Sequence, residues 1–238
     1  MQTNEHQAVV LHTRSYQENS LLVSLWLRDI GKVSGIVRGV RGKKKPNLCQ
    51  PFVLLDTALK QPRSNDGLVQ VQRLEQTRVF HSGTYLSHLA RLYLNELAYR
   101  ILPQDHHDSN LFDQYLVAME QLVNDAVERP LRFFELQFLK SLGYSFQCDV
   151  DEAGDPVEWD AWYAMSPLSA FYKARHQEGI KGEMIQKLYQ DIHLWSNQEL
   201  RQIHQLLRMN LDACLHGRPL KTRALLKEYL EKKRGMFS

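Results

Sequence analysis

The sequence predicts an α+β fold in which an N-terminal five-stranded β-barrel is followed by an α-helical domain. Two observations predict it. Within the first eighty residues, short runs rich in Val, Leu and Ile alternate with turn residues, as in a small all-β domain. After Gln76, apolar residues recur at helical spacing instead. We therefore expect a barrel domain over residues 1–80 and a helical domain over residues 81–238, with a loop-rich insert at about 145–180.

Turn chemistry separates the predicted strands of the barrel domain. Arg-Asp-Ile-Gly follows the second strand, Lys-Pro-Asn lies before the fourth, and Pro-Arg-Ser-Asn-Asp-Gly precedes the fifth. Five strands at this spacing suit a small Greek-key barrel of the oligonucleotide-binding (OB) type. The predicted strands are Gln7–Thr13, Ser20–Leu27, Lys32–Val40, Phe52–Lys60 and Leu68–Glu75.

The second and third strands predict a register. If Leu25 lies opposite Val33 and Leu21 opposite Val37, five Leu and Val side chains of the two strands share one face, whereas a one-residue slip scrambles both faces. The expected inward set is Leu21, Val23, Leu25, Val33 and Val37. The outer face then carries the pairs Trp26 with Lys32, Ser24 with Ser34 and Ser20 with Arg38.

Trp26 on that outer face has two interpretations. In the first, a base of a single strand stacks on its ring. In the second, Trp26 is a core residue that is buried under a neighbouring helix. Large aromatic side chains are more often core, so the second interpretation is slightly favoured.

Helix boundaries in the second domain follow from capping residues. A first helix runs from Tyr85 up to Pro103, and Asp108 is a good N-cap for a second helix that reaches Leu122. Pro130 opens a third helix and Gly143 closes it. A short helix is expected near Glu183–Ile192, a Ser196/Glu199 capping box opens a longer one that ends near Gly217, and the last helix starts at Pro219.

A basic stretch from Gly31 to Pro46 is the strongest functional signal in the chain. No acidic residue occurs between Asp29 and Asp56, so the positive charge is local even though the net charge is only +3. Such clustering beside a barrel favours contact with nucleic-acid phosphates over a solvated charge run. The candidate DNA-binding residues here are Trp26, Lys32, Arg38, Arg41, Lys43, Lys44 and Lys45, with Arg14 and Arg63 as further candidates that flank barrel loops.

Other classes of protein lack support in the sequence. The three cysteines are far apart, which argues against a disulfide framework and against a zinc site built from cysteines alone. We see neither a leader peptide nor an eighteen-residue apolar run, so a soluble cytoplasmic protein without membrane contact is expected. Phosphate-binding loops, nucleophile elbows and catalytic triads are likewise missing as motifs, so we expect no enzyme activity and no cofactor.

Three ordered motifs identify a resemblance. The run Tyr16–Leu27 with Gly31-Lys32-Val33 and Val37–Arg41 resembles the amino-terminal signature of the RecO family of bacterial recombination mediators. Arg132-Phe133-Phe134-Glu135, leading to Leu142-Gly143-Tyr144, resembles the central helix of that family. Gly217-Arg218-Pro219-Leu220-Lys221-Thr222-Arg223 resembles its carboxy-terminal motif. Together they span the whole chain.

The resemblance implies an OB barrel, a helical domain and a non-enzymatic role in the RecF pathway of recombinational repair. It implies binding of single- and double-stranded DNA, annealing of complementary strands, and work with RecR. It also implies binding of the acidic C-terminal tail of the single-stranded DNA-binding protein, which helps RecA load on coated strands. A cytoplasmic, nucleoid-associated protein is the matching location.

Two further groups of site residues are expected. Arg218, Lys221 and Arg223 place cations at the start of the last helix, where the helix dipole disfavours them, so they either bind DNA or pair with an acid of a neighbouring helix such as the one bearing Glu228. Arg132 with Leu131, Phe134 and Leu136 would form a cationic, apolar site for the tail of the coating protein.

One departure from the family concerns metal. Many members carry two Cys-x-x-Cys pairs after the Leu-Gly-Tyr motif, whereas Cys148 stands alone here, so no zinc is expected. His106-His107-Asp108 resembles a ligand cluster, but its adjacent side chains point apart in a polar loop, and a hydrolase built on it is remote. An RNA-binding OB-fold accessory factor remains the alternative function, because OB barrels serve both nucleic acids.

Overall fold

A computed structural model describes residues 5–39, 48–60, 67–80, 82–104, 106–175, 179–190 and 195–235. Its contacts divide the chain into two compact units, one formed by Met1–Val127 with Leu220–Ser238 and the other by Glu128–Pro219. This grouping cuts the chain at different places from the division at residue 80 that the composition predicts. The barrel therefore shares its unit with the first two helices and with the last one.

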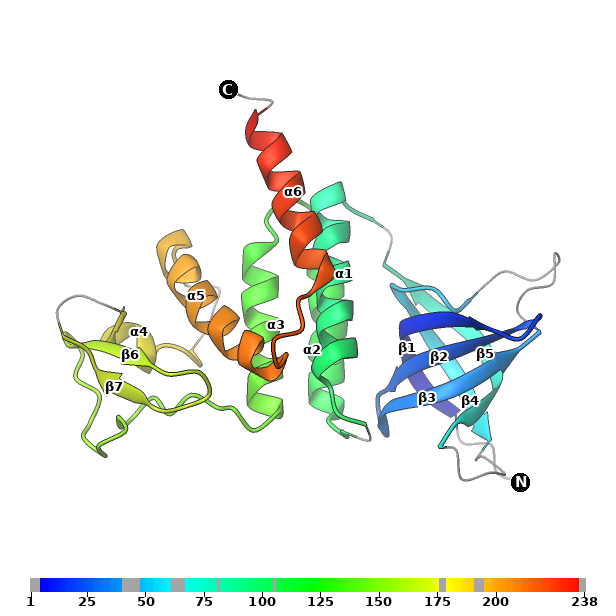
Figure 1. Cartoon of the computed structure of the whole chain (residues 1–238), viewed down its shortest axis with the longest axis horizontal. Helices are drawn as coiled ribbons and strands as arrows, with labels where there is room; N and C mark the ends of the chain where they lie inside the picture. The colour runs from blue at the N-terminus through cyan, green and yellow to red at the C-terminus, as the bar shows by residue number, and fades with distance from the viewer. Residues whose placement is uncertain are drawn as a thin grey trace. The chain divides into compact units, whose positions relative to one another are not determined.

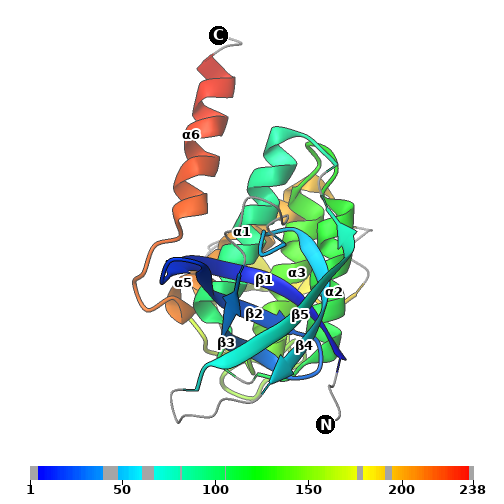
Figure 2. The same ribbon diagram turned by 90° about the vertical axis from the view of Figure 1, so that its right-hand side faces the viewer.

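The first unit contains the predicted five-stranded barrel (Figure 2). Its closed strand order is β1-β2-β3-β5-β4, in which β3 and β5 run parallel and the other neighbours antiparallel. Alternating Val, Leu and Ala side chains from all five strands fill the interior. The strands are β1 (Glu5–Tyr16), β2 (Ser20–Leu27), β3 (Gly31–Arg38), β4 (Val53–Lys60) and β5 (Val69–Val79).

The predicted register of β2 and β3 is confirmed. Leu25 lies opposite Val33, Leu21 opposite Val37, and Trp26 opposite Lys32. Val23, Leu25, Val33 and Val37 are in the barrel core, and Leu21 packs against it partly buried. Because burial of one face fixes a two-residue period, apolar pattern alone was sufficient to specify this pairing.

Three helices complete the first unit (Figure 1). They are α1 (Tyr85–Ile101), α2 (Ser109–Gln121) and α6 (Lys221–Gly235). The predicted cap is confirmed, since the Asp108 carboxylate accepts a hydrogen bond from the Leu111 amide at 2.9 Å. That carboxylate is committed to the helix start, which weakens its candidacy as a metal ligand.

Side chains of α1 and α2 fasten the helices to the barrel. The Asn95 amide on α1 donates to the backbone carbonyl of Leu11 at 2.6 Å, and the Tyr115 hydroxyl on α2 donates to Asn95 at 3.1 Å. Arg28, just after β2, makes two hydrogen bonds to the Asp113 carboxylate on α2. Full burial raises the pKa of Tyr115, so its hydroxyl keeps the proton that this network uses.

The second unit combines helices with a small sheet that the sequence analysis did not predict. A three-stranded sheet of order β7-β6-β8 occupies part of the expected loop-rich insert. Its strands are two to four residues long, too short to show a two-residue period. The elements are α3 (Glu128–Ser141), β6 (Trp162–Met165), β7 (Phe171–Lys173), β8 (Ile180–Lys181), α4 (Gly182–Gln186) and α5 (Asn197–Cys214).

Helix caps in the second unit match the sequence more closely than helix lengths do. Ser196 and Glu199 form the predicted capping box at the start of α5. The short helix expected at 183–192 is described only as α4, which ends at Gln186, while residues 191–194 lie outside the described residues. Within the described part of the chain, no helix has the length and apolar character needed to cross a membrane.

Candidate nucleic-acid interface

The outer surface of strands β1, β2 and β3 is divided between two environments. Near the β2–β3 turn, the outward side chain of Trp26 packs under α2, with its ring 5.4 Å from Phe112 and 5.3 Å from Tyr115. Toward the other end of these strands, most outward side chains are exposed or half-buried, although Ser20 is buried. We call this second part the distal face and define it by Arg14, Tyr16, Leu22, Ile36 and Arg38.

Strand pairing places the distal-face residues in two rows. Arg14 pairs with Leu22, which pairs with Ile36 on β3. In the next row, Tyr16 pairs with Ser20, which pairs with Arg38. Paired residues on one face of a sheet lie about 5 Å apart, so the two arginines flank a half-buried apolar patch. Sites that bind single-stranded nucleic acid usually combine cations with apolar and aromatic surface.

A β-bulge in β1 determines which side chains reach this face. The register of β1 against β2 shifts between Val10 and His12. Val10 belongs to the barrel core, so strict alternation would also point His12 and Arg14 inward. The extra residue reverses the alternation, and His12 and Arg14 turn outward while Thr13 pairs with the inward Val23. From the sequence, Arg14 is only a secondary candidate for DNA binding, and no pattern points to His12.

Beside the distal face, His12 meets α1 and α6. Its ring is stacked on Tyr99 of α1, with ring centroids 4.6 Å apart and planes 12° apart. The charges of Arg100 on α1, Arg14 on β1 and Lys221 on α6 all act on the imidazole. Burial first, and then these three cations, lower the pKa of His12. We call His12, Arg14, Arg100 and Lys221 the junction cluster.

The start of α6 is fixed by a carboxylate from α1. Glu96 accepts hydrogen bonds from the backbone amides of Lys221 at 3.1 Å and Thr222 at 2.9 Å, and from the Thr222 hydroxyl at 2.7 Å. Its negative charge compensates the positive end of the helix dipole, where two cations would otherwise be unfavourable. The acid at the start of α6 is therefore Glu96, which binds backbone amides there, whereas Glu228 pairs with Lys232 within α6.

Glu96 is expected to contribute about 1–3 kcal/mol to stability through these charge-assisted hydrogen bonds. Burial acts to raise its pKa, but hydrogen bonds from Thr222 and Lys221 and the charge of Arg100 outweigh burial and lower the pKa. A depressed carboxyl pKa stabilises the fold above the unfolded-state pKa, and this stability is lost as the pH falls through the folded-state value. Urea unfolding of Glu96→Gln should therefore show a deficit at pH 7 that shrinks at pH 3.

Glu231→Gln is the matched control for that measurement. Glu231 lies on α6 and pairs with Lys227 at 3.8 Å, but 64% of its side chain is exposed. Exposed pairs of this kind contribute little. Equal unfolding curves for the two variants at pH 7 would show that Glu96 does not anchor α6.

Two predicted site residues are in the core. Trp26 is 1% exposed, so the interpretation as core residue is the one that the structure supports, and its ring is not available to a base. Lys32 is 9% exposed, and its ammonium donates to the Tyr99 carbonyl at 3.1 Å near the end of α1. Burial lowers the pKa of Lys32. Both residues face outward as expected, but the helices cover them, so we leave them out of the interface.

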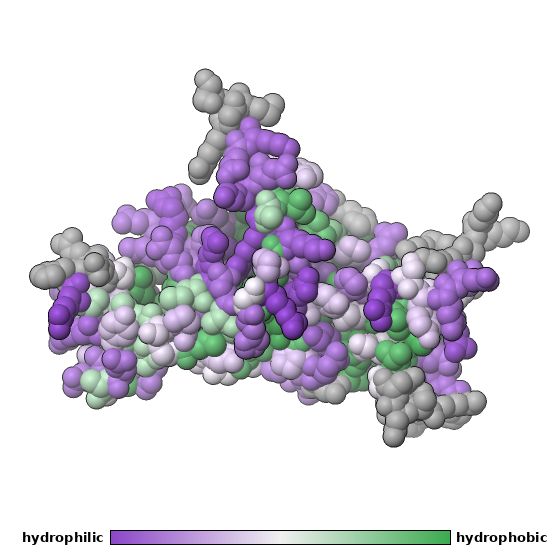
Figure 3. Space-filling view, viewed as in Figure 1, coloured by the Kyte–Doolittle hydropathy of each residue, from purple (hydrophilic) through white to green (hydrophobic). Residues whose placement is uncertain are grey.

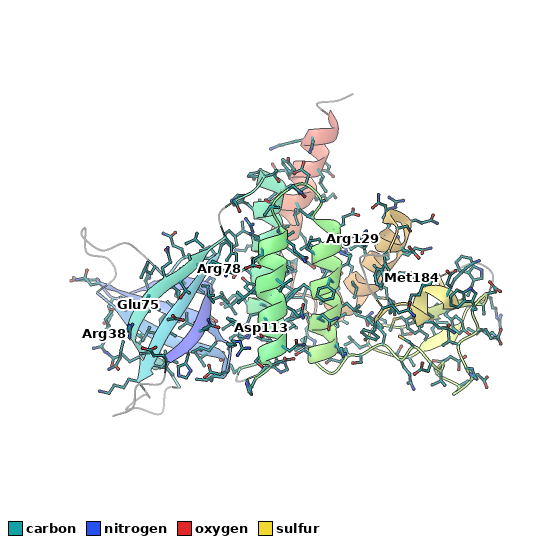
Figure 4. The ribbon with its side chains drawn as sticks, turned by 180° about the vertical axis from the view of Figure 1, so that it is seen from behind. Arg38, Glu75, Arg78, Asp113, Arg129 and Met184 are labelled. Atoms are coloured by element: carbon teal, nitrogen blue, oxygen red, sulfur yellow. The ribbon has the colours of Figure 1, made fainter. Side chains whose placement is uncertain are left out.

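The structure describes only some of the other predicted DNA-binding residues. Arg41, Lys43, Lys44 and Lys45 lie outside the described residues, as does Arg63. Arg38 is exposed at the end of β3, and no ion pair within the described residues involves it (Figure 4). Arg223 rests over the buried Tyr93 ring at 5.8 Å, and Arg218 is exposed between α5 and α6.

The basic end of α6 is occupied by local ion pairs. Hydrophilic residues dominate the visible side of this helix in the space-filling view (Figure 3). Lys232 pairs with Glu228 at 2.7 Å, and Lys233 pairs with Asp125 at 2.8 Å. These lysines thus have acidic partners, unlike Arg14 and Arg38, for which the described residues offer none.

Formal charge is divided unequally between the two units. The first unit has 20 Lys and Arg against 14 Asp and Glu, a net charge of +6. The second has 10 against 13, a net charge of −3. A polyanion is therefore attracted to the unit with the barrel and repelled by the other.

The predicted tail-binding residues lie together on α3 in the second unit. Leu131, Phe134 and Leu136 are buried, and Phe134 stacks on Phe138 at 5.5 Å. Arg132 is 7% exposed and 3.2 Å from the Glu135 carboxylate, while its Nη1 has no hydrogen-bond partner among the described residues. A buried guanidinium nitrogen without an acceptor is costly, but the burial that leaves Nη1 unsatisfied also hides it from solvent.

No group of three or more metal-ligating side chains occurs among the described residues. Cys49, Cys148 and Cys214 form no disulfide within the described part of the chain, and burial raises the pKa of both Cys49 and Cys148 to about 11. Protonated thiols are poor metal ligands and poor nucleophiles.

Comparisons with known proteins agree across the whole chain. Residues 1–80 match the family model described as recombination protein O N terminal, and residues 84–224 match recombination protein O C terminal. A curated relative from Francisella tularensis subsp. novicida, called DNA repair protein RecO, is 34% identical over 227 residues, which cover 94% of this chain and 97% of the relative. Proteins of the same name from Stutzerimonas stutzeri and Pseudoalteromonas atlantica are 33% and 31% identical, over 96% and 99% of both chains.

Proposed function

Because the chain belongs to the recombination protein O (RecO) family of DNA repair and recombination proteins, we propose that it binds single- and double-stranded DNA through the distal face of its barrel. The observation that carries this proposal is the pair Arg14 and Arg38, exposed on the outward side of an OB barrel in the unit with net charge +6. Phosphates are the ligands that such cations suit.

The proposed activity is strand annealing without chemistry on the DNA. Two complementary strands repel each other through their phosphates, and cations that neutralise one strand let the second approach. Contacts of this kind are independent of sequence and weaken steeply with salt. No cofactor takes part in this proposal, and the protein acts as a binding surface rather than an enzyme.

The basic segment that follows Arg38 in the sequence is part of the proposed site. Arg41, Lys43, Lys44 and Lys45 follow β3 directly in the chain. Changing Lys43, Lys44 and Lys45 together to Ala is expected to weaken binding of a fluorescent single-stranded oligonucleotide. For single strands, each lost phosphate contact should also lower the slope of log affinity against log salt by about 0.7. Fluorescence anisotropy across a salt series measures both quantities.

A triple change of Lys227, Lys232 and Lys233 to Ala is the matched control. It removes the same charge from α6, where the lysines pair with acids. If the Lys43/Lys44/Lys45 variant has the affinity and the salt slope of the wild type, these lysines do not contact phosphates. The site would then lie on the distal face and the helices. Tighter binding of an RNA oligonucleotide of the same sequence would favour the RNA-binding alternative instead.

We further propose that the second unit binds the acidic C-terminal tail of the single-stranded DNA-binding protein. Arg132 would bind the terminal carboxylate, and Leu131, Phe134 and Leu136 would shape the apolar side of the site. The unsatisfied guanidinium of Arg132 favours an added carboxylate, and because all four side chains are buried, binding requires this part of α3 to become accessible. Cooperation with RecR and loading of RecA would follow on the strand from which the coating protein is released. Such work belongs in the cytoplasm, at the nucleoid.

A further inference from the structure

Four basic or titratable side chains from three separate elements meet in the junction cluster. Arg14 comes from β1, Arg100 from the last turn of α1, and Lys221 from the first residue of α6. All three are exposed, and their charges act on His12. Like charges brought together by the fold repel one another, so the arrangement is unfavourable unless an anion joins it.

The geometry holds the imidazole of His12 in a defined position. One ring face lies against Tyr99 at 4.6 Å, and Arg100 lies over the Tyr99 ring at 5.8 Å. The bulge in β1 turns His12 outward, and the residue remains exposed. Packing on Tyr99 therefore orients and partly covers the ring, while the residue as a whole remains exposed to a ligand.

The acid beside the cluster is already engaged. Glu96 is 3.8 Å from Arg100, but both of its carboxylate oxygens accept hydrogen bonds from the start of α6. Its charge is used on the helix dipole and on Arg100. Among the described residues, no ion pair involves Arg14 or Lys221 (their side chains are exposed). Positive charge is thus in excess around His12.

We propose that the junction cluster is a second phosphate site, in which His12 contacts a phosphodiester group of single-stranded nucleic acid and takes up a proton from solvent as it binds. This inference rests on the proposed DNA-binding function and extends it from the distal face to α1 and α6. The ligand recognised is the phosphate, independently of base and sugar.

Proton uptake follows from the electrostatics of the cluster. Without ligand, burial and the three cations hold the pKa of His12 below its ordinary value, so the ring is neutral at pH 7. A phosphate among these cations cancels their repulsion and adds a negative charge beside the ring, which raises the pKa. Tyr99 on α1 stacks on the ring of His12 and Ser24 on β2 pairs with it, and neither is a cation; Glu96, the nearby acid, lies 3.8 Å from Arg100.

The test compares His12→Phe with the wild type. Phe keeps a flat ring to pack on Tyr99 but accepts no proton. Affinity for a fluorescent oligothymidylate is measured at pH 7.5 and pH 5.5 at constant salt. A rise of one unit in the His12 pKa on binding corresponds to about tenfold in affinity. For such a rise, the affinity of the wild type should increase about tenfold more on acidification than that of His12→Phe. His107→Phe, an exposed histidine in the loop before α2, should behave as the wild type.

A second measurement on the wild type keeps the inference testable if His12→Phe folds poorly. NMR titration of the His12 ring protons should give a higher pKa with saturating oligothymidylate than without it. If binding leaves the pKa unchanged, or if wild type and His12→Phe gain equally at pH 5.5, the junction cluster is not a phosphate site although DNA binding stands. If the wild type binds no oligonucleotide at either pH, the proposed function fails and the inference fails with it.

Discussion

Reversing Arg14 and Arg38 together to Glu is expected to lower the affinity for a single-stranded oligonucleotide by about a hundredfold at moderate salt. Each arginine is exposed on the distal face, and each reversal replaces attraction to a phosphate by repulsion. One phosphate contact accounts for about threefold of the affinity change between about 50 and 200 mM salt. Because reversal adds repulsion to the lost attraction, we expect roughly tenfold for each position. Fluorescence anisotropy with the two single variants would show whether the two effects add.

A double reversal on β5 is the matched control. Arg73→Glu with Arg78→Glu changes the net charge of the barrel unit by the same amount. Arg73 pairs with Glu5 and Glu75, and Arg78 pairs with Glu120, so neither is expected to bind phosphate (Figure 4). Equal losses in both double variants would mean that overall charge, and not the distal face, controls binding.

Trp26→Ala is expected to lower the free energy of unfolding by about 3–5 kcal/mol, the largest effect of any single change considered for this chain. The indole is fully buried against Phe112 and Tyr115, so its removal leaves a cavity between barrel and helix. Trp26→Phe keeps most of the packing and should cost much less. Urea unfolding followed by circular dichroism measures both variants.

The same two variants separate packing from base stacking. If Trp26 is a core residue only, Trp26→Phe should bind a single strand as the wild type does. A stable Trp26→Ala protein with a large, selective loss of strand binding would contradict the packing role and return Trp26 to the interface.

Local patterns predicted the fold where one face of an element is buried. The alternation in β2 and β3 specified their pairing, and Asp108 and Ser196 specified where α2 and α5 begin. In each case the signal lies within a few residues of the structure that it predicts. Strands β6, β7 and β8 gave no such signal because they are too short to show a period.

Site residues were predicted less completely because their environment depends on distant parts of the chain. Trp26 and Lys32 lie outward as the register requires, yet helices more than sixty residues later cover them. The bulge at His12 is hidden in the sequence because Ala8 through Leu11 is an unbroken apolar run. Glu96 and Lys221 are 125 residues apart, and no local pattern joins them.

The return of the last helix to the first unit has a consequence for biosynthesis. Translation proceeds from the N-terminus, so the barrel, α1 and α2 leave the ribosome well before α6, and the whole of the second unit is made in between. Until residues 221 and 222 emerge, the Glu96 carboxylate has no amides of α6 from which to accept hydrogen bonds. The charge of Lys221 is also absent from the surroundings of His12 and Arg100. The second unit can thus fold before the first unit is complete. The junction cluster is assembled only when the final stretch of the chain has been made.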